Sequence, residues 1–340
     1  MPMKYLKIRF QRASIVLLAI VLTAGSLPAQ TKSNFTDGEG FVNVDGVKIW
    51  YKVEGARGTN KTPVLMIHGG PGATARPFEK TIGPLLAKSS PVIYMDYRGA
   101  GRSDRPKDPK KYSFTILAND AEVLRKHLGI EKWVVFGHSN GGATALTYAL
   151  RDSNHVAALI LCDPLLSPID LEMNMINKTA LAPSDKYEQA RAIYKSGASE
   201  EERFGKLLDL LDQKTRDSFQ FYDPVNSSLY SKIQSELSKE ISKGLMEPAL
   251  IQGLIASGFF QFDEFKSAAL VSMPTLLLLG RYDSEISIDN SMKFTLTVPD
   301  GYVAVVNRSG HHPYLEETVA SAEKIDAFLT GHVDNRNHWK

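Results

Sequence analysis

Short continuous runs of apolar residues recur along the chain, with segments of helical spacing between them. The runs cover residues 63–67, 91–95, 133–136 and 156–161. Apolar runs without polar alternation are typical of strands buried on both faces, as in a parallel sheet. Helix-like segments at 116–128 and 142–150 favour right-handed crossover units, and alternating residues around Asp45-Gly46 indicate a β-hairpin at the start. The pattern predicts an α/β fold with a mostly parallel central sheet and helices on both faces.

The strand pattern is interrupted once. Between residues 165 and 266 the strand-like runs stop, and Lys, Glu, Ser and Leu recur at helical spacing. The later elements expected are strands at 275–279 and 302–306 and a closing helix at 319–329. Because strand patterns lie on both sides, we expect one α/β domain, 30–164 and 267–340, with a helical cap inserted at 165–266. Two independent domains are the alternative.

The N-terminal segment has the layout of a secretory signal peptide. It begins with four basic residues, Lys4, Lys7, Arg9 and Arg12. An apolar stretch from residue 13 to 22 follows, then small and turn residues as far as Ala29. This order predicts a signal peptide at 1–29 and an exported protein, periplasmic or secreted. An uncleaved anchor is the alternative, but the apolar stretch is shorter than the roughly 20 residues of a bilayer span. No stable membrane insertion is expected after cleavage.

Composition removes several classes of function. The 340 residues carry 40 basic and 38 acidic side chains, and without the first 29 residues 36 basic and 38 acidic ones are left. A nearly neutral chain without a basic stripe gives no reason to expect nucleic acid as a partner. The one cysteine, Cys162, cannot form an internal disulfide or a cysteine-rich metal site. Its place at the end of an apolar run favours a buried, inert thiol.

The strongest chemical signal follows the apolar run 133–136. There Gly137-His138-Ser139-Asn140-Gly141 puts a serine between two glycines, after a predicted strand and before a predicted helix. A serine on such a sharp turn needs a strained backbone, and larger neighbours would clash with adjoining elements. The N-terminus of the helix offers free amides to an oxyanion. We therefore predict that Ser139 is a nucleophile; an ordinary turn serine is the alternative.

A serine hydroxyl is a poor nucleophile without a base. Among the eight histidines, His311 lies in a loop after the strand-like run 302–306 and directly follows Gly310. The carboxyl end of a late strand is where a Gly-x-Ser-x-Gly fold delivers its base. We predict that His311 is the base, and His312 is its competitor. The alternative is that His311 is a solvated loop histidine without a catalytic role.

The base in turn needs a carboxylate that fixes its tautomer and stabilises the imidazolium. Asp283 follows the apolar run 276–279 and gives the chain order Ser, Asp, His. Asp163, which ends the strand before the insertion, is the rival, and Glu285 is a weaker one. We predict that Asp283 is the acid.

A glycine-rich loop, His68-Gly69-Gly70-Pro71-Gly72, follows the predicted strand at 64–67. Small residues let a backbone amide face the reaction centre. We expect the oxyanion hole to consist of the amides of Gly70 and Asn140, and a simple tight turn is the alternative. A phosphate loop is excluded because no Lys-Ser/Thr follows the glycines.

These motifs together resemble the prolyl aminopeptidase (proline iminopeptidase) branch of the α/β-hydrolases. The resemblance covers roughly 41–163 and 267–330. It is carried by His68–Gly72, Asp96-Tyr97-Arg98-Gly99-Ala100-Gly101-Arg102-Ser103, Gly137–Gly142, Gly280–Asp283 and Gly310-His311. It implies the α/β-hydrolase fold and an architectural role for Asp96 and Arg98.

The chain also departs from that branch. Asn140 stands where the family usually has an aromatic residue. The family holds the substrate's free amine with acidic cap residues, whereas Glu172, Glu240 and Glu247 of this cap sit in no motif and are interpreted as exposed helix-face charges.

Acyl transfer through an acyl-enzyme is the expected chemistry, with no cofactor and no metal. The resemblance implies a peptidase that releases an N-terminal residue from a small peptide. A carboxylesterase or lactonase acting on a small ester is the alternative, and a non-catalytic ligand-binding relative is a remote one. Ser139 argues against epoxide hydrolases and dehalogenases, which need a carboxylate at the position of this serine. No residues that bind the substrate follow from the sequence.

Overall fold

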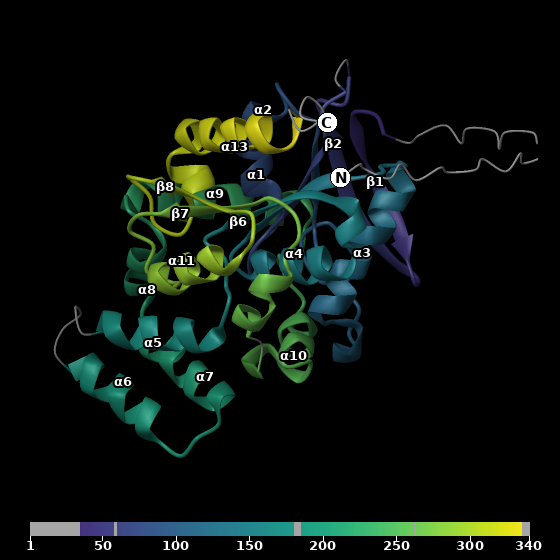
Figure 1. The fold of residues 1–340 in the computed structure, drawn as a ribbon. Coiled ribbons are helices and arrows are strands. Elements are labelled where there is room, and N and C mark those ends of the chain that lie inside the picture. The colour runs from purple at the N-terminus through teal and green to yellow at the C-terminus, as the bar shows by residue number, and fades with distance from the viewer. Residues whose placement is uncertain (1–34, 58–59, 180–184, 262, 335–340) are drawn as a thin grey trace, which may run out of the picture. The chain divides into compact units, whose positions relative to one another are not determined.

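The computed structural model describes residues 35–57, 60–179, 185–261 and 263–334, which belong to one compact unit (Figure 1). The predicted signal peptide at 1–29 lies outside the described residues. None of the helices within the described residues has the length and hydrophobicity of a membrane span.

An eight-stranded sheet runs through this unit in the order β1-β2-β4-β3-β5-β6-β7-β8. The strands are β1 Gly38–Val44, β2 Val47–Glu54, β3 Val64–Ile67, β4 Val92–Met95, β5 Trp133–His138, β6 Val156–Cys162, β7 Thr275–Gly280 and β8 Gly301–Val306. The hairpin of β1 and β2 and its pairing with β4 are antiparallel, and all pairings from β4 to β8 are parallel. The predicted mostly parallel sheet is confirmed. The hairpin turns at Asp45-Gly46, both with positive φ, as the sequence indicates.

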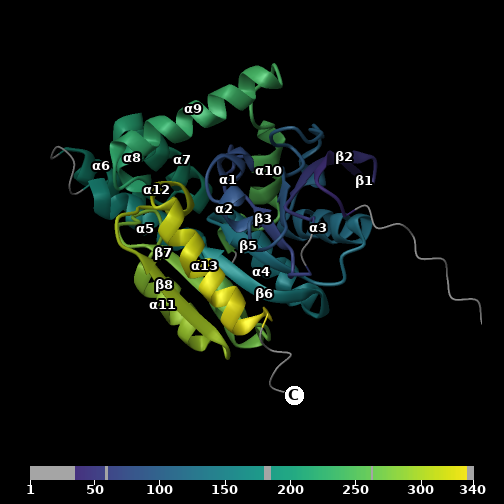
Figure 2. The same ribbon diagram turned by 90° about the horizontal axis from the view of Figure 1, so that it is seen from above.

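Helices cover both faces of the sheet, as predicted (Figures 1 and 2). They are α1 Arg76–Lys80, α2 Gly83–Leu86, α3 Phe114–Leu128, α4 Asn140–Arg151, α11 Ile288–Thr297, α12 Pro313–Glu316 and α13 Thr318–His332, with 3-10 turns η1 Pro109–Lys111 and η2 Ser153–His155. One buried cluster joins alternate strand residues such as Leu65 to α3, α4 and α11. The other joins the opposite set, such as Met66, to α1, α2, α12 and α13. Side chains of successive strand residues point to opposite faces, so the continuous apolar runs of the sequence fill both cores.

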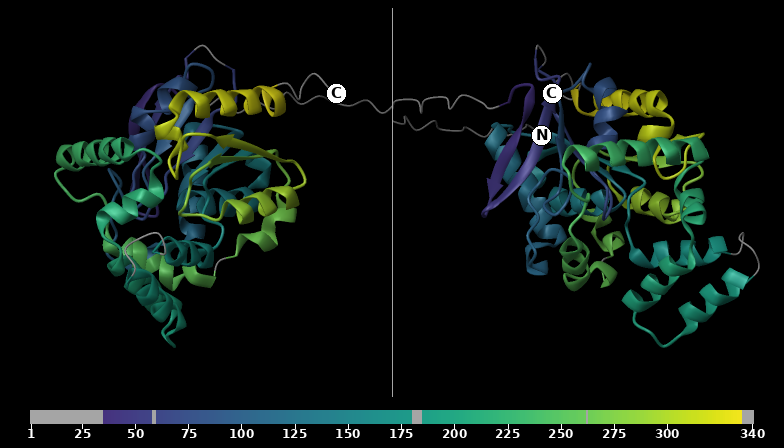
Figure 3. Two further views of the ribbon diagram at one scale, coloured as in Figure 1. Left: turned by 90° about the vertical axis from the view of Figure 1, so that its left-hand side faces the viewer. Right: turned by 180° about the vertical axis from the view of Figure 1, so that it is seen from behind.

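Between β6 and β7 the described chain is mainly helical. The elements are α5 Pro168–Thr179, α6 Asp185–Lys195, α7 Glu200–Leu210, α8 Gln213–Gln220, α9 Pro224–Glu240, α10 Pro248–Ala256, η3 Phe259–Gln261 and η4 Glu264–Leu270. Figure 3 shows α5, α6 and α7 side by side, with α9 lying apart from them.

Among the described residues, α5 to α8 form a small core of their own, a cluster around Leu207 and Phe219. Ile233 of α9 and Leu250 of α10 belong instead to the two cores of the sheet. The cap as a unit at 165–266 therefore stays a prediction.

Candidate active site

Ser139 lies on the sharp turn between β5 and α4. Its backbone has φ 54° and ψ −124°, the strained conformation that the motif requires. A Cβ on Gly141 would clash with the carbonyl oxygens of His68 and Ile67. The glycine therefore lets the loop after β3 pass directly against this turn. Ser139 itself is half-buried and lines a cavity.

His311 and Asp283 meet beside this turn. His311 Nδ1 lies 2.8 Å from Asp283 Oδ2, and both side chains are buried. Asp283 Oδ1 accepts the backbone N–H groups of Glu285 at 2.7 Å and Ile286 at 3.3 Å, which fix the carboxylate. His311 lines the same cavity as Ser139. The structure thus places an oriented imidazole in the cavity that holds the serine.

The competing residues have other partners. His312 Nδ1 lies 2.9 Å from the hydroxyl of Tyr314, and its ring stacks on Phe221. The backbone N–H of Gly280 donates to Asp163 Oδ1 at 3.0 Å. Burial and the neighbouring Asp283 carboxylate raise the pKa of Asp163 well above its usual value. Asp163 is therefore a neighbour of Asp283, while Asp283 is the one that contacts His311.

The backbone of His311 is held from two sides. Burial and the nearby His311 lower the pKa of His138 well below its usual value, so its ring is neutral. It donates from Nε2 to the carbonyl oxygen of His311 at 2.7 Å. On the other side the N–H of His311 donates to the carbonyl oxygen of Gln220, at the end of α8, at 2.7 Å. Sequence reasoning missed both residues, since nothing in their spacing predicts these contacts.

Of the two predicted oxyanion donors, Asn140 lies at the turn of Ser139 and Gly70 lies in the loop after β3. Asn140 is the first residue of α4 and is buried, and Gly70 lines the cavity. Gly70 has φ +123°, a conformation that other residues rarely adopt. Position 70 therefore requires glycine because of this backbone conformation.

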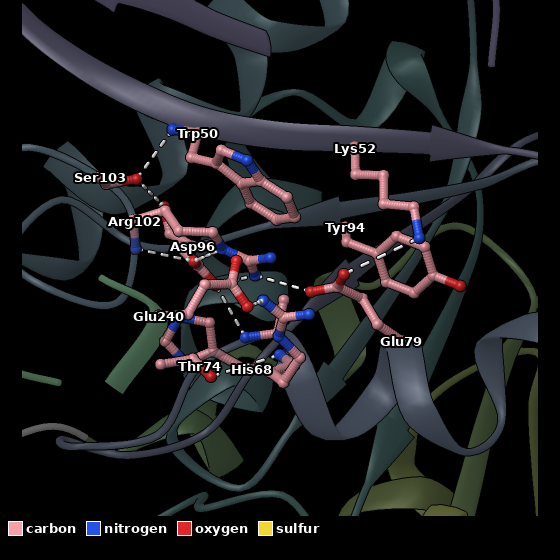
Figure 4. A network of polar contacts seen from close by, with 12 residues as sticks. Trp50, Lys52, His68, Thr74, Glu79, Tyr94, Asp96, Arg102, Ser103 and Glu240 are labelled. Carbon is pink, nitrogen blue, oxygen red and sulfur yellow. Dashed lines mark hydrogen bonds and ion pairs between the residues drawn. The ribbon is translucent and has the colours of Figure 1, made fainter. Parts of the chain in front are cut away.

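A buried network holds the loop that carries Gly70 (Figure 4). Asp96 Oδ1 accepts the N–H of Ala75 at 2.8 Å, and Arg102 Nε donates to Asp96 Oδ2 at 2.7 Å. Burial would raise the pKa of Asp96, but the Arg102 guanidinium outweighs it and keeps the pKa below the usual value. The guanidinium also lies over the ring of Trp50, 3.1 Å from its centroid.

The neighbouring arginine of the same motif is also structural. Arg98 donates to both carboxylate oxygens of Asp120, at 2.7 and 2.5 Å, in a buried ion pair. Asp96 and Arg98 thus shape the fold around the site, as expected from the resemblance.

The cavity at the site has a volume of about 1010 Å³. Among the described residues, three Glu, Asp, Lys or Arg side chains line it: Glu201, Arg216 and Glu285. Glu201 is exposed, and Arg216 Nη1 donates to the carbonyl of Leu208 at 3.3 Å. Glu285 is half-buried, and Gln220 Nε2 donates to its Oε1 at 2.8 Å.

The three cap acids singled out in the sequence do not line this cavity. Glu172 pairs with Arg203, Glu240 with Arg76 and Glu247 with Lys107. Glu240 is exposed, but Glu172 and Glu247 are buried, so their interpretation as exposed helix-face charges is wrong. Glu285 is the carboxylate that sequence reasoning considered only as a rival triad acid. Its position two residues after Asp283 is the signal that could have found it.

The remaining predictions concern metals and the thiol. Among the described residues, no three His, Cys, Asp or Glu side chains group as a metal site. Cys162 is buried, and burial raises the pKa of its thiol well above the usual value, as an inert thiol requires.

The chain is similar in sequence to known α/β-hydrolases. Residues 62–318 match the family model described as alpha/beta hydrolase fold. The chain is 25% identical over 295 residues to a proline iminopeptidase of Heyndrickxia coagulans, covering 86% of this chain and 98% of that one. It is 26% identical to a 2-hydroxy-6-oxo-6-(2'-aminophenyl)hexa-2,4-dienoic acid hydrolase of Metapseudomonas resinovorans, over 87% and 92% of the two chains.

Solved structures share the fold. A proline iminopeptidase-related protein of Thermus thermophilus superposes with a TM-score of 0.73 at 22% identity, covering 88% of this chain and 99% of that one. An esterase of Exiguobacterium antarcticum has a TM-score of 0.61 at 22% identity, covering 85% and 98%. At these identities the likeness concerns the fold alone.

Proposed function

Because the chain belongs to the α/β-hydrolase fold family and is a hydrolase, we propose that Ser139, His311 and Asp283 form its catalytic triad. The observation that carries this proposal is the buried contact between His311 and Asp283 beside a serine with strained backbone geometry. The chemistry is acyl transfer to a serine and then to water.

The reaction proceeds in two halves. The Oγ of Ser139 bonds to the scissile carbonyl carbon while its proton passes to Nε2 of His311. The amides of Gly70 and Asn140 hold the oxyanion. The carbon–leaving-group bond then breaks, and His311 returns the proton to the alcohol or amine that departs. In the second half His311 takes a proton from water, whose oxygen bonds to the acyl carbon, and Ser139 regains its proton as the acid leaves.

Labelling with a fluorophosphonate tests the nucleophile without knowledge of the substrate. The wild-type protein should be labelled and Ser139→Ala should not, because the probe reacts with the activated hydroxyl. Ser218→Ala, which removes an exposed hydroxyl on α8, is the matched control and should be labelled normally. Persistent labelling of Ser139→Ala would overturn the proposal.

For the substrate, we propose release of an N-terminal residue from a small peptide. Support comes from the relatives with the name proline iminopeptidase and from the Glu285 carboxylate in the cavity. An aminopeptidase must bind a free ammonium group, and a desolvated ammonium is costly unless a carboxylate pairs with it. Glu285 is the half-buried carboxylate of the cavity, held in place by Gln220.

Two linked assays test this substrate class. Prolyl p-nitroanilide should be cleaved, and N-acetylation of the proline should remove most of the activity. Glu285→Gln should raise KM for the free substrate at least tenfold, because one charge-assisted contact is worth about 1.5–3 kcal/mol. Glu188→Gln, at an exposed glutamate that does not line the cavity, is the control and should leave KM unchanged. Equal cleavage of blocked and free substrates, or turnover of p-nitrophenyl esters alone, would refute the aminopeptidase.

A carboxylesterase or lactonase is the second candidate. The observation that favours it is the lining of the cavity, where apolar side chains outnumber charged ones. An ester needs no ammonium site, so Glu285→Gln would then leave KM unchanged. The same panel of substrates therefore separates the two candidates.

We also propose that the protein is exported. The support is the order of a basic segment, an apolar stretch and small residues up to Ala29 in the sequence.

A further inference from the structure

The cavity beside the triad extends well beyond the reacting atoms. Pockets for drug-sized ligands have volumes of about 300–1,000 Å³, and this cavity has about 1010 Å³. A prolyl group, with one five-membered ring and a carbonyl, fills only a small part of such a space. The remaining volume has room for a larger group on the substrate.

The side of the cavity formed by α7, α10 and η3 is mainly apolar, and its charged lining residue is the exposed Glu201 of α7. Six of its apolar lining side chains are Phe204 and Leu208 of α7, Ile251 and Ile255 of α10, and Phe259 and Phe260 of η3. We call this part, defined by these six residues, the apolar chamber.

Aromatic contacts join the α7 residues of the apolar chamber to its η3 residues. The rings of Phe204 and Phe260 are 5.8 Å apart at 66°, an edge-to-face contact between α7 and η3. Phe260 in turn packs edge-to-face on Phe259, with centroids 5.2 Å apart. These contacts give the apolar chamber a defined wall, so its occupant has a limited length.

We propose that the apolar chamber binds an apolar chain or ring attached next to the scissile carbonyl, so that substrates are esters or amides with a sizeable apolar group. This inference rests on the proposed function of Ser139. Burying a methylene group contributes about 0.8 kcal/mol, or roughly fourfold in kcat/KM for each carbon added. That gain continues until the chain reaches the wall and then ends.

A glycine in α7 offers a way to shorten the apolar chamber. Gly205 follows Phe204, lines the cavity, and a Cβ added there would meet no atom within 4 Å. Gly205→Leu therefore adds bulk at the cavity without a clash at its Cβ. Gly331 of α13 is a matched control, because it is also an exposed helical glycine with no atom within 4 Å of an added Cβ and does not line the cavity.

The experiment measures kcat/KM for two series of esters on the wild type and both variants. One series lengthens the acyl group of p-nitrophenyl esters from acetyl to decanoyl, and the other lengthens the alcohol of acetate esters. Whichever side enters the apolar chamber should show the roughly fourfold gain per carbon. Gly205→Leu should lower kcat/KM for the longest productive ester at least tenfold and for the shortest less than twofold. Gly331→Leu should match the wild type throughout.

The outcomes separate this inference from the proposed function. If the fluorophosphonate labels Ser139 but both series are flat, or Gly205→Leu changes short and long esters alike, the apolar chamber is not a substrate site. If Ser139 is not labelled, the proposed triad fails first. Equal thermal unfolding temperatures of the three proteins show that a loss of rate is not a loss of fold.

Discussion

The choice between the two neighbouring aspartates can be tested with one isosteric substitution at each. Asp283→Asn removes the charge that lies 2.8 Å from Nδ1 of His311. Asp163→Asn makes the same change on the side chain that accepts the N–H of Gly280. We expect the first variant to lose nearly all activity and the second to keep most of it.

The magnitude follows from the charges in the reaction. When Ser139 gives its proton to His311, the imidazolium forms next to the Asp283 carboxylate. Unit charges 4 Å apart attract by about 4 kcal/mol at an effective dielectric constant of about 20. That energy corresponds to roughly 10³-fold in rate. The amide of an asparagine also favours the wrong imidazole tautomer, which brings the loss towards about 10⁴-fold, as in triads of serine proteases.

Asp163 has no comparable charge to lose. Burial and the Asp283 carboxylate raise its pKa well above the usual value, which favours the protonated form of Asp163. An asparagine at 163 can still accept from Gly280 and can donate to Asp283, as a protonated carboxyl does. We expect a loss of less than about tenfold, which is the scale of one neutral hydrogen bond.

The second-order rate of fluorophosphonate labelling is the assay, because it reports activation of Ser139 whatever the substrate is. Thermal unfolding of both variants controls for folding. The reasoning is refuted if Asp163→Asn slows labelling by three orders of magnitude while Asp283→Asn reacts like the wild type.

Three further predictions concern stability and location. Asp120→Asn should cost about 3–5 kcal/mol in urea unfolding, because it leaves the buried Arg98 uncompensated; a cost below about 1 kcal/mol, as expected for Glu188→Gln in an exposed ion pair, would contradict it. The raised pKa of Asp163 means that the native state keeps a proton which the unfolded chain loses near pH 4, so this group lowers wild-type stability as the pH rises above about 4. The free energy of unfolding of Asp163→Asn should therefore rise relative to that of the wild type between about pH 4 and 7. A difference between the two proteins that stays constant over this range would count against the raised pKa. N-terminal sequencing of the exported fraction should begin near Gln30, and an intact Met1 in a cytosolic fraction would show that the export proposal is wrong.

The sheet could be predicted from the sequence because its signals are local. Continuous apolar runs mark strands buried on both faces, and Asp45-Gly46 marks a turn. The geometry at Ser139 could equally be predicted from the sequence, since a strand, two glycines and a helix leave few other conformations for the serine.

The pairing of the acid with the base could not be settled from spacing. Asp163 follows β6 and Asp283 follows β7, and these strands are neighbours in the sheet. Their carboxyl ends therefore lie together, and both carboxylates come close to one position. Which of them contacts His311 depends on the path of each loop over a few ångströms, and hydrophobic periodicity carries no information at that scale.

The cavity could not be predicted from the sequence, for a related reason. Leu207 of α7 is fully buried in the small cluster of α5 to α8, whereas Phe204 and Leu208 pack against that cluster and also line the cavity. A helical pattern reveals that a face is apolar, but an apolar face can meet a core, a partner or a bound substrate. Only the positions of α10 and η3, which come later in the chain, turn this face into one wall of a chamber. If the apolar chamber binds the substrate as we propose, the size of the substrate depends on how helices distant in the sequence are placed around Ser139. Variants of α7 should then change the preferred substrate size without changing the reactivity of Ser139.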